Sequence, residues 1–555
     1  MTPLPSTAAR ASCPRPQASR LRSLLLPLHF CFLLSAFPFS LSAQTLTAAD
    51  VTLIVRQAVA RAQIVSPNST IAVVDREGNV LSVRAAGAAP TAQQTGEAIS
   101  RAGTAAFLNS NQNAFTTRTA AYVVQDNFPP GIINRNNGPL TGVNFSHLPY
   151  SDVNRFRRPP FPDYNALPLF PAIGTLGAPI QFTSLSGFPG GVPLYKQGVL
   201  VGGIGVVGDG NDTINPVSVN QPDVDEDVAL AGQIGFAPAV SIRANRVFLE
   251  GISVPYVKSS TALPNPLPAL GGADVPGFPI TASPLPATYP SIPNAYPPIP
   301  GAADPILSAA GLIGELRAPV ISDPAAVPAS QKLSDADVRN IMISAYRRAL
   351  ITRSAVRNPI GGPTSMWIVV VGRGDATVVP NVRPPILGVF KMPDAVTRSW
   401  DFAVAKGRTC VGFSSNVRAF SSRTAGFLSQ RFFPPGINGT SSGPFFGLQA
   451  TYSNTSIVPG DLLNPSASAP NTFFANGITI FPGGQPLYKG SVLVGAIGIS
   501  GDAIDQDDLV AAAGAAATRA DGQGSFVPPP AIRADAFAYR GVRLPLAKFP
   551  RQPVR

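Results

Sequence analysis

The sequence predicts an α/β (α+β) protein built from two related domains, each a mainly antiparallel sheet flanked by helices. Its 555 residues allow two domains and a linker, at roughly 100–200 residues per domain. Segments recur in the same order in the two halves, and in each half helical and strand-like apolar patterns alternate. We place the domains at 44–257 and 332–550, after an N-terminal segment at 1–43 and on either side of a linker at 258–331.

Residues 1–43 have the pattern of a bacterial secretory signal peptide. Four arginines and no acidic residue precede a mostly apolar run at 24–41, and small residues at 41–43 form a cleavage site. An uncleaved membrane anchor is the alternative, but Pro27 and Pro38 interrupt the run. We therefore expect a secreted or periplasmic protein without a transmembrane span after cleavage.

The predicted mature chain has few residues for metal binding or nucleophilic catalysis. Cys410 is its single cysteine and His147 its single histidine. One cysteine excludes an internal disulfide, and structural zinc needs about four Cys or His ligands. The formal charge of +12 falls to +8 without the four leader arginines. The basic residues are scattered rather than clustered, so we do not expect nucleic acid as a partner.

An internal duplication is the strongest signal in the sequence. The matching segments keep their order and nearly their spacing, so one domain occurs twice with small insertions. The matched pairs are Phe128–Ile132 with Phe433–Ile437, Phe188–Lys196 with Phe481–Lys489, Val199–Gly205 with Val492–Gly498, and Ile242–Asn245 with Ile532–Asp535.

Each copy predicts the same elements in the same order: helix, hairpin, helix, loop-rich region, second hairpin and final helix. Acidic residues at the start of the final helix complement the positive end of its dipole. In the first copy these elements are a helix from the cap Thr47 to about Gln63, strands at 71–75 and 80–83, a helix at 92–108, a hairpin at 193–206 and a helix opening at 223–227. The counterparts are a helix from Ser334, strands at 367–371 and 386–390, a helix at 395–413, a hairpin at 486–499 and a helix opening at 505–508.

The linker is rich in proline, with 12 prolines in the 43 residues from Lys258 to Pro300. This composition predicts a semi-rigid spacer with no regular helix or sheet. A short helix is expected at 306–317.

Together these motifs resemble the GlcG/HbpS-like haem-binding (haem-degrading) family. The resemblance covers both copies but not the linker, and it implies a profilin-like fold, a tendency to oligomerise, and haem or tetrapyrrole binding. The chain departs from the family in mid-domain insertions at about 109–188 and 414–481, and in the absence of histidine from both first helices. The segments that carry the resemblance are Ala72–Val80, Ala98–Ala106, Pro189–Leu194, Val199–Gly205, Ala403–Thr409, Pro482–Leu487 and Val492–Gly501.

If haem is bound, its iron needs a His, Met, Cys or Tyr donor. Alignment of Gly138 with Gly443 places His147 opposite Tyr452, so this pair is the candidate for the iron. Both residues lie in insertions, and an exposed or hydrogen-bonded loop position is the alternative. Cys410 and the methionines are expected in the core.

The two Pro-Gly-Gly segments offer a second type of site. The backbone N–H groups of Gly190 and Gly191, and of Gly483 and Gly484, are candidates for holding a carboxylate or a haem propionate. A tight turn that needs positive φ is the alternative, and we favour it.

Two further motifs predict structure rather than function. Gly203–Gly208 has the spacing of a dinucleotide site but is followed by a polar loop instead of a helix, so we reject a nucleotide site. Its alternating glycines instead indicate close approach of a helix or ligand. Asp223, Asp225 and Asp227 lack the glycine and glutamate of a calcium loop and are interpreted as helix capping.

Three functions remain open from the sequence. The first is an exported binding protein for haem or another small organic ligand. The second is a structural or interaction protein that keeps the fold and binds an envelope protein. The third, ranked last because one histidine and one cysteine leave few catalytic groups, is an enzyme acting on haem. The duplication also predicts an intramolecular pseudo-dimer in place of a homo-oligomer.

Overall fold

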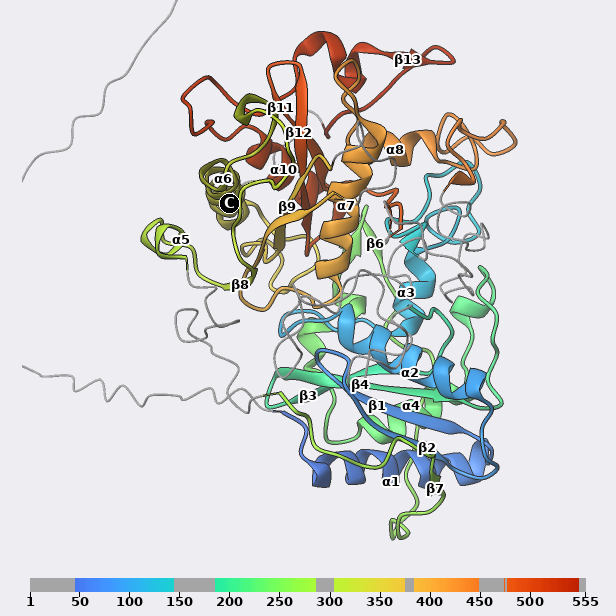
Figure 1. Cartoon of the computed structure of the whole chain (residues 1–555). Helices are drawn as coiled ribbons and strands as arrows, with labels where there is room; N and C mark the ends of the chain where they lie inside the picture. The colour runs from blue at the N-terminus through green and yellow to red at the C-terminus, as the bar shows by residue number, and fades with distance from the viewer. Residues whose placement is uncertain are drawn as a thin grey trace, which may run out of the picture. The chain divides into compact units, whose positions relative to one another are not determined.

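The computed structural model describes residues 45–143, 185–285, 304–374, 384–448, 474 and 477–548. All of these belong to one compact unit. Each copy carries one five-stranded antiparallel sheet with helices on its faces, as the sequence predicts (Figure 1).

The first sheet has the strand order β3-β4-β1-β2-β7. Its central strand β1 pairs with β2 on one side and β4 on the other, so that Val73 lies opposite Ser82 and Ile204. The elements of this copy are α1 (Ala48–Val65), β1 (Thr70–Asp75), β2 (Val80–Ala85), α2 (Ala92–Phe107), α3 (Thr117–Val123), β3 (Gly191–Lys196), β4 (Val199–Val207), α4 (Val224–Gln233) and β7 (Ala273–Asp274).

The second sheet has the equivalent order β11-β12-β9-β10-β8. Its elements are β8 (Glu315–Ala318), α6 (Asp335–Ile351), β9 (Trp367–Gly372), β10 (Ile386–Lys391), α7 (Ser399–Phe413), α8 (Ser422–Leu428), β11 (Gly484–Lys489), β12 (Val492–Ser500) and α10 (Ile504–Ala515). The described residues also form these short elements: η3 (Ser218–Asn220), η4 (Val240–Ile242), η5 (Ala244–Arg246), β5 (Phe248–Leu249), β6 (Ile252–Ser253), α5 (Pro305–Ala309), η7 (Ala329–Gln331), η8 (Pro530–Ile532), η9 (Ala534–Ala536), β13 (Ala538–Tyr539) and β14 (Val542–Arg543).

Both faces of each sheet are buried, which explains the continuous apolar strands. In β1, Ile71 and Val73 join the core beneath α1 and α4, whereas Ala72 and Val74 join the core beneath α2. This follows from the two-residue period of a strand. In the second copy α6 and α10 cover one face and α7 covers the other.

Glycines let α2 and α7 lie directly on a strand, which confirms the packing interpretation of the alternating glycines at Gly203–Gly208 and shows the same packing at Gly498. A Cβ at Gly205 would lie 2.2 Å from the carbonyl oxygen of Ala98 in α2. At Gly498 it would lie 1.8 Å from that of Ala403 in α7. Only glycine fits, because these neighbours are backbone atoms that cannot rotate away.

The predicted helix starts are largely confirmed. Thr47 and Ser334 each form a capping box with an aspartate three residues later. Asp223 caps α4 by accepting from two backbone N–H groups, as the helix-capping interpretation requires. The helix predicted at 395–413 begins later, at Ser399, because the preceding residues form turns.

The expectation that the linker contains no sheet was wrong. Ala273 and Asp274 form β7 and pair with Arg84 and Ala85 at the edge of the first sheet. Edge strands tolerate proline-rich surroundings because only one side donates to the ladder. The helix expected at 306–317 is also shorter, since α5 ends at Ala309 and β8 follows it into the second sheet.

The two copies share contacts and part of one apolar core. That core contains residues of both, including Ala102 of α2 and Trp400 of α7. Asp394 accepts from Arg76 at 2.6 Å and from the backbone N–H of Asn111, both in the first copy. Among the described residues, none of the helices has the length and apolarity needed to cross a membrane.

Candidate functional site

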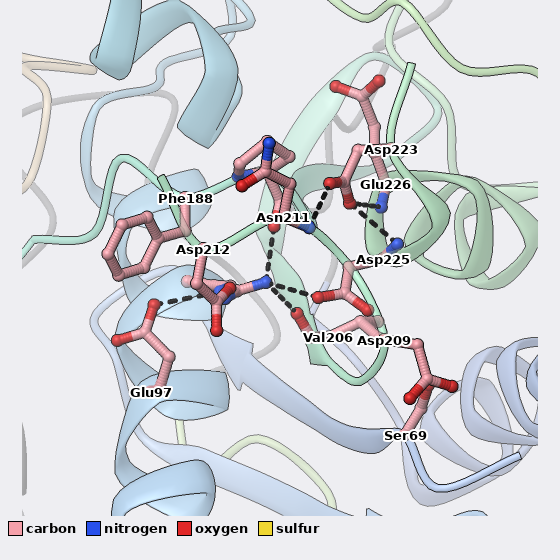
Figure 2. Close-up of polar contacts among 12 residues, drawn as sticks. Ser69, Glu97, Phe188, Val206, Asp209, Asn211, Asp212, Asp223, Asp225 and Glu226 are labelled. Carbon is pink, nitrogen blue, oxygen red and sulfur yellow. Dashed lines mark hydrogen bonds and ion pairs between the residues drawn. The ribbon is translucent and has the colours of Figure 1, made fainter. Parts of the chain in front are cut away.

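A fully buried arginine lies at the glycine strand of the first copy. Arg101 of α2 contacts three carboxylates, and Figure 2 shows Glu97, Asp212 and Asp225 converging on its guanidinium. Its Nη1 also donates to the carbonyl oxygens of Pro189 (2.6 Å) and Val206 (2.8 Å). One side chain thus ties α2 to the Pro-Gly-Gly turn, β4 and α4.

Burial and the neighbouring charges shift the pKa values of the residues in this cluster. Burial raises the pKa of Asp225 to about 7, although Arg101 opposes that shift. Burial likewise raises the pKa of Glu97. Burial alone would lower the pKa of Arg101, but the surrounding carboxylates raise it above its ordinary value. The arginine therefore remains charged, and each of its three guanidinium nitrogens donates to an acceptor within the protein.

The second copy replaces this arginine with a lysine. Lys406 of α7 donates to Asp507 at 2.7 Å and to the carbonyl oxygen of Ile499 at 2.8 Å. Burial lowers the pKa of Lys406 and raises that of Asp507 to about 7. Both copies therefore use a buried cation to hold the glycine strand to the final helix. These paired cations are part of the fold.

The glycines considered as a candidate anion site lie beside these cations, since a Cβ at Gly190 would lie 3.0 Å from Nη1 of Arg101 and one at Gly483 would lie 2.7 Å from Nζ of Lys406. Gly190 and Gly483 adopt φ of 114° and 118°, the positive values expected of a tight turn. The N–H groups of Gly191 and Gly484 already donate to the hydroxyls of Thr117 and Ser422, at 3.0 and 2.8 Å. A ligand carboxylate would have to compete with these internal acceptors.

A cavity of about 90 Å³ lies near Lys406, with residues of both copies in its wall. Its surface is mostly apolar. Phe402 and Phe481 form one side in an edge-to-face pair with ring centroids 5.4 Å apart. The first copy contributes apolar residues from α3, β5 and the neighbouring loops, namely Leu108, Phe115, Ala120, Val123, Leu140, Leu249 and Val254.

Arg398 is the unusual residue of this cavity. It precedes α7, is only 2% exposed and lines the cavity wall. Its Nε and Nη2 atoms are buried without a hydrogen-bond partner among the described residues. The ring of Phe107 covers the guanidinium, with its centroid 5.4 Å from Cζ. Burial lowers the pKa of Arg398 well below its ordinary value, and Asp401 only partly opposes this.

The other ionisable groups at the cavity have internal partners. Lys406 and Asp507 bind each other. Asp502 accepts from the Ser354 hydroxyl at 2.5 Å and from a backbone N–H at 2.8 Å. Arg398 therefore differs from all three in presenting buried donors that no described residue satisfies.

The structure leaves the predicted iron ligands untested. His147 and Tyr452 lie outside the described residues. Cys410 is fully buried, and burial raises the pKa of its thiol far above the ordinary value. Met342, Met366 and Met392 are buried core residues, as predicted. Over the described ranges there is no group of three or more His, Cys, Asp or Glu residues suited to a metal ion.

Sequence reasoning did not identify Arg398. The offset of 305 that aligns the second helices pairs it with Gln93, an exposed residue at the start of α2. An unmatched arginine beside an apolar helix start was the only available signal. This signal does not show that Arg398 is buried, because most arginines lie on the protein surface.

Comparison with known proteins identifies the family. Residues 46–214 and 379–516 match the family described as "Haem degrading protein HbpS-like", and together they are more than half of the chain. The chain belongs to the HbpS-like family. The two matched segments correspond to the two copies of the duplication. No curated protein sequence matches the chain.

Three solved structures share limited similarity with this family member. Klebsiella pneumoniae protein ORFY is 19% identical over 34% of this chain and 92% of its own, with a TM-score of 0.22. A double mutant of Streptomyces reticuli HbpS is 21% identical over 40% of this chain and 97% of its own, with a TM-score of 0.20. The protein in the PduOC–haem complex is 19% identical over 33% of this chain and 92% of its own, with a TM-score of 0.18.

The cavity does not fit the haem that the family description implies. Among the residues that the structure describes, its wall contains no His, Met, Cys or Tyr to serve as an axial ligand. Its volume of about 90 Å³ is below that of the roughly 150 Å³ apolar cavities that admit benzene. A haem bound by this protein would need a different place and a donor such as His147 or Tyr452.

Proposed function

We propose that this chain is an exported tandem-domain binding protein that holds haem or another small organic ligand without turning it over. The observation that carries the proposal is the family match on both copies. The mostly apolar cavity supports only the alternative of a ligand smaller than haem, since apolar cavities with a few polar groups are the usual form of small-molecule sites. Export rests on the signal pattern at 1–43.

We also propose that the two copies act as an intramolecular pseudo-dimer. The shared core and the Asp394 contacts support this arrangement. It predicts that the mature chain is active as a binding protein without forming a homodimer. Sedimentation of the mature chain as a monomer, with ligand bound, is the expected result.

Hemin titration of the mature protein tests the haem version. We expect a saturable change of the Soret band at micromolar protein, which is weakened in His147→Ala or Tyr452→Phe. Leu53→Ala, on the exposed part of α1, is the control and should bind as the wild type does. Absence of any Soret shift in all four proteins would rule haem out.

A structural or interaction protein of the cell envelope is the second candidate. The lack of an axial donor among the described wall residues of the cavity favours it, because the fold can persist without a haem site. This candidate predicts a colourless protein that ignores hemin and co-purifies with a specific envelope protein. A haem-degrading enzyme ranks third, and peroxide-dependent loss of haem absorbance beyond that of an unrelated haem protein would support it.

A further inference from the structure

We propose that the cavity beside α7 is a binding site for a short apolar chain ending in a carboxylate, and that Arg398 holds that carboxylate. This inference deepens the proposed small-molecule binding and rests on it, but it does not require haem. It names a site, a ligand class and one recognition residue.

The guanidinium of Arg398 has buried donors that no described residue satisfies. Nε and Nη2 of Arg398 are buried without acceptors among the described residues, on a side chain that is 2% exposed. A buried charge without partners is costly, and proteins ordinarily pair it. A carboxylate in the cavity would supply two acceptor oxygens in the planar geometry that a guanidinium fits best.

The wall of the cavity is mostly apolar. Phe402, Phe481 and Ile504 of the second copy face Ala120 and Leu140 of the first, and they belong to one apolar cluster. Such a surface favours a hydrocarbon chain over a sugar or nucleotide. The wall also contains polar side chains, of which Asn113 and Thr119 already donate to backbone carbonyl oxygens. The ligand is thus expected to be polar only at the end that meets Arg398.

The size of the cavity limits the ligand to a few atoms. A cavity of about 90 Å³ holds fewer atoms than the roughly 150 Å³ cavities that take benzene. It fits a propionate-sized group. Such a group has two sources: a free short-chain acid, or the acid side arm of a larger molecule whose remainder stays outside.

The aspartates near the cavity do not remove its preference for a carboxylate. Asp502 and Asp507, which also line the cavity, already accept hydrogen bonds from the protein. Asp401 acts on Arg398 through its charge, yet leaves two guanidinium nitrogens without acceptors. Among the described wall residues, Arg398 therefore remains a cationic group with donors to offer a ligand.

Sodium propionate and its neutral analogue propionamide are the probes for a test on the full mature chain. Saturation-transfer NMR should show propionate binding about tenfold or more tightly than propionamide, since a charge-assisted pair replaces a neutral one. Fluorescence of Trp400, two residues from Arg398, gives a second readout. Equal affinity for the acid and the amide would overturn the proposal.

Three variants make the test specific. Arg398→Gln, which installs the residue of the other copy, should lower propionate affinity about tenfold or more. Gln93→Arg is the matched control, placing an arginine at the exposed equivalent position, and should change nothing. Ala120→Leu fills the cavity while keeping Arg398, and it should also block binding. Unchanged binding in Arg398→Gln would refute the assignment.

Hemin and hemin dimethyl ester distinguish the two sources of the carboxylate. If the acid is a side arm, hemin should bind more tightly than its ester, and Arg398→Gln should remove the difference. The cavity proposal fails, and the proposed haem function stands, if hemin binds the wild type and all variants with equal affinity while propionate binds to none of these proteins. If propionate binds through Arg398 and hemin does not bind, the haem version fails and the cavity site stands.

Discussion

Replacement of Gly498 by alanine probes the close contact between β12 and α7. The added Cβ would lie 1.8 Å from the carbonyl oxygen of Ala403 and 2.9 Å from the backbone nitrogen of Gly407. Ordinary contact begins at 3.4 Å, so the helix and strand must separate locally by about 1.6 Å. Overpacking of this kind costs about 1–3 kcal/mol, and rigid backbone on both sides places this site at the upper end.

Urea unfolding followed by tryptophan fluorescence measures the effect. The chain's two tryptophans, Trp367 and Trp400, both lie in the second copy and are buried next to each other, so they report on this domain. We expect Gly498→Ala to lower the unfolding free energy by about 3 kcal/mol. The matched control is Gly362→Ala, whose Cβ would lie 3.5 Å from its nearest neighbour. It should stay within about 0.5 kcal/mol of the wild type. A similarly small effect of Gly498→Ala would refute the close-packing argument.

Three further predictions concern buried polar groups. Arg398→Met should stabilise the ligand-free chain by about 1–3 kcal/mol in the same unfolding assay, because it removes a buried cation whose Nε and Nη2 have no hydrogen-bond partner among the described residues; clear destabilisation would mean that the arginine is satisfied. Asp394→Asn should destabilise by about 2–4 kcal/mol at neutral pH, since Arg76 and Arg357 lose their anion. Burial alone would raise the pKa of Asp394, but the two arginines outweigh it and hold that pKa below 3.8, so the contribution of the carboxylate is full above that pH and is lost as pH falls further. The gap between wild type and Asp394→Asn should narrow in acid, and a constant gap from neutral pH to strong acid would contradict this. Cys410 should react with a thiol reagent only after unfolding, as judged by a colorimetric assay with and without denaturant; rapid reaction of the native chain would mean that the thiol is accessible.

The sequence predicted the architecture well because the fold depends on local patterns. The caps Thr47 and Ser334 lie where the helices begin, and the hairpins turn at the predicted places. The alternating glycines of β4 were correctly interpreted as close-approach positions, since they leave room for the backbone of a neighbouring element. Gly498 of β12 makes the same close approach although the glycines of that strand do not alternate.

The linker was harder to predict because its strands depend on tertiary pairing. Ala273–Asp274 is too short to show an alternating pattern, and it becomes a strand only by adding to the edge of β2. Similarly, β8 completes the second sheet although local composition suggested a helix. Edge strands of this kind are specified by the neighbouring sheet.

The candidate cavity could not be predicted because it is formed by residues far apart in the sequence. Arg398 and Ala120 line one space only after both copies have folded. Two features make Arg398 informative: its burial, and the lack of hydrogen-bond partners for Nε and Nη2 among the described residues. Both are properties of that assembled space.

The central claim is that this member of the HbpS-like family holds a small organic molecule. Native mass spectrometry of the mature chain, as purified and after hemin or propionate is added, tests it most directly. The account predicts a mass increment that disappears on denaturation and whose value identifies haem or a small acid. Native and denatured masses that agree under all three conditions would contradict the claim.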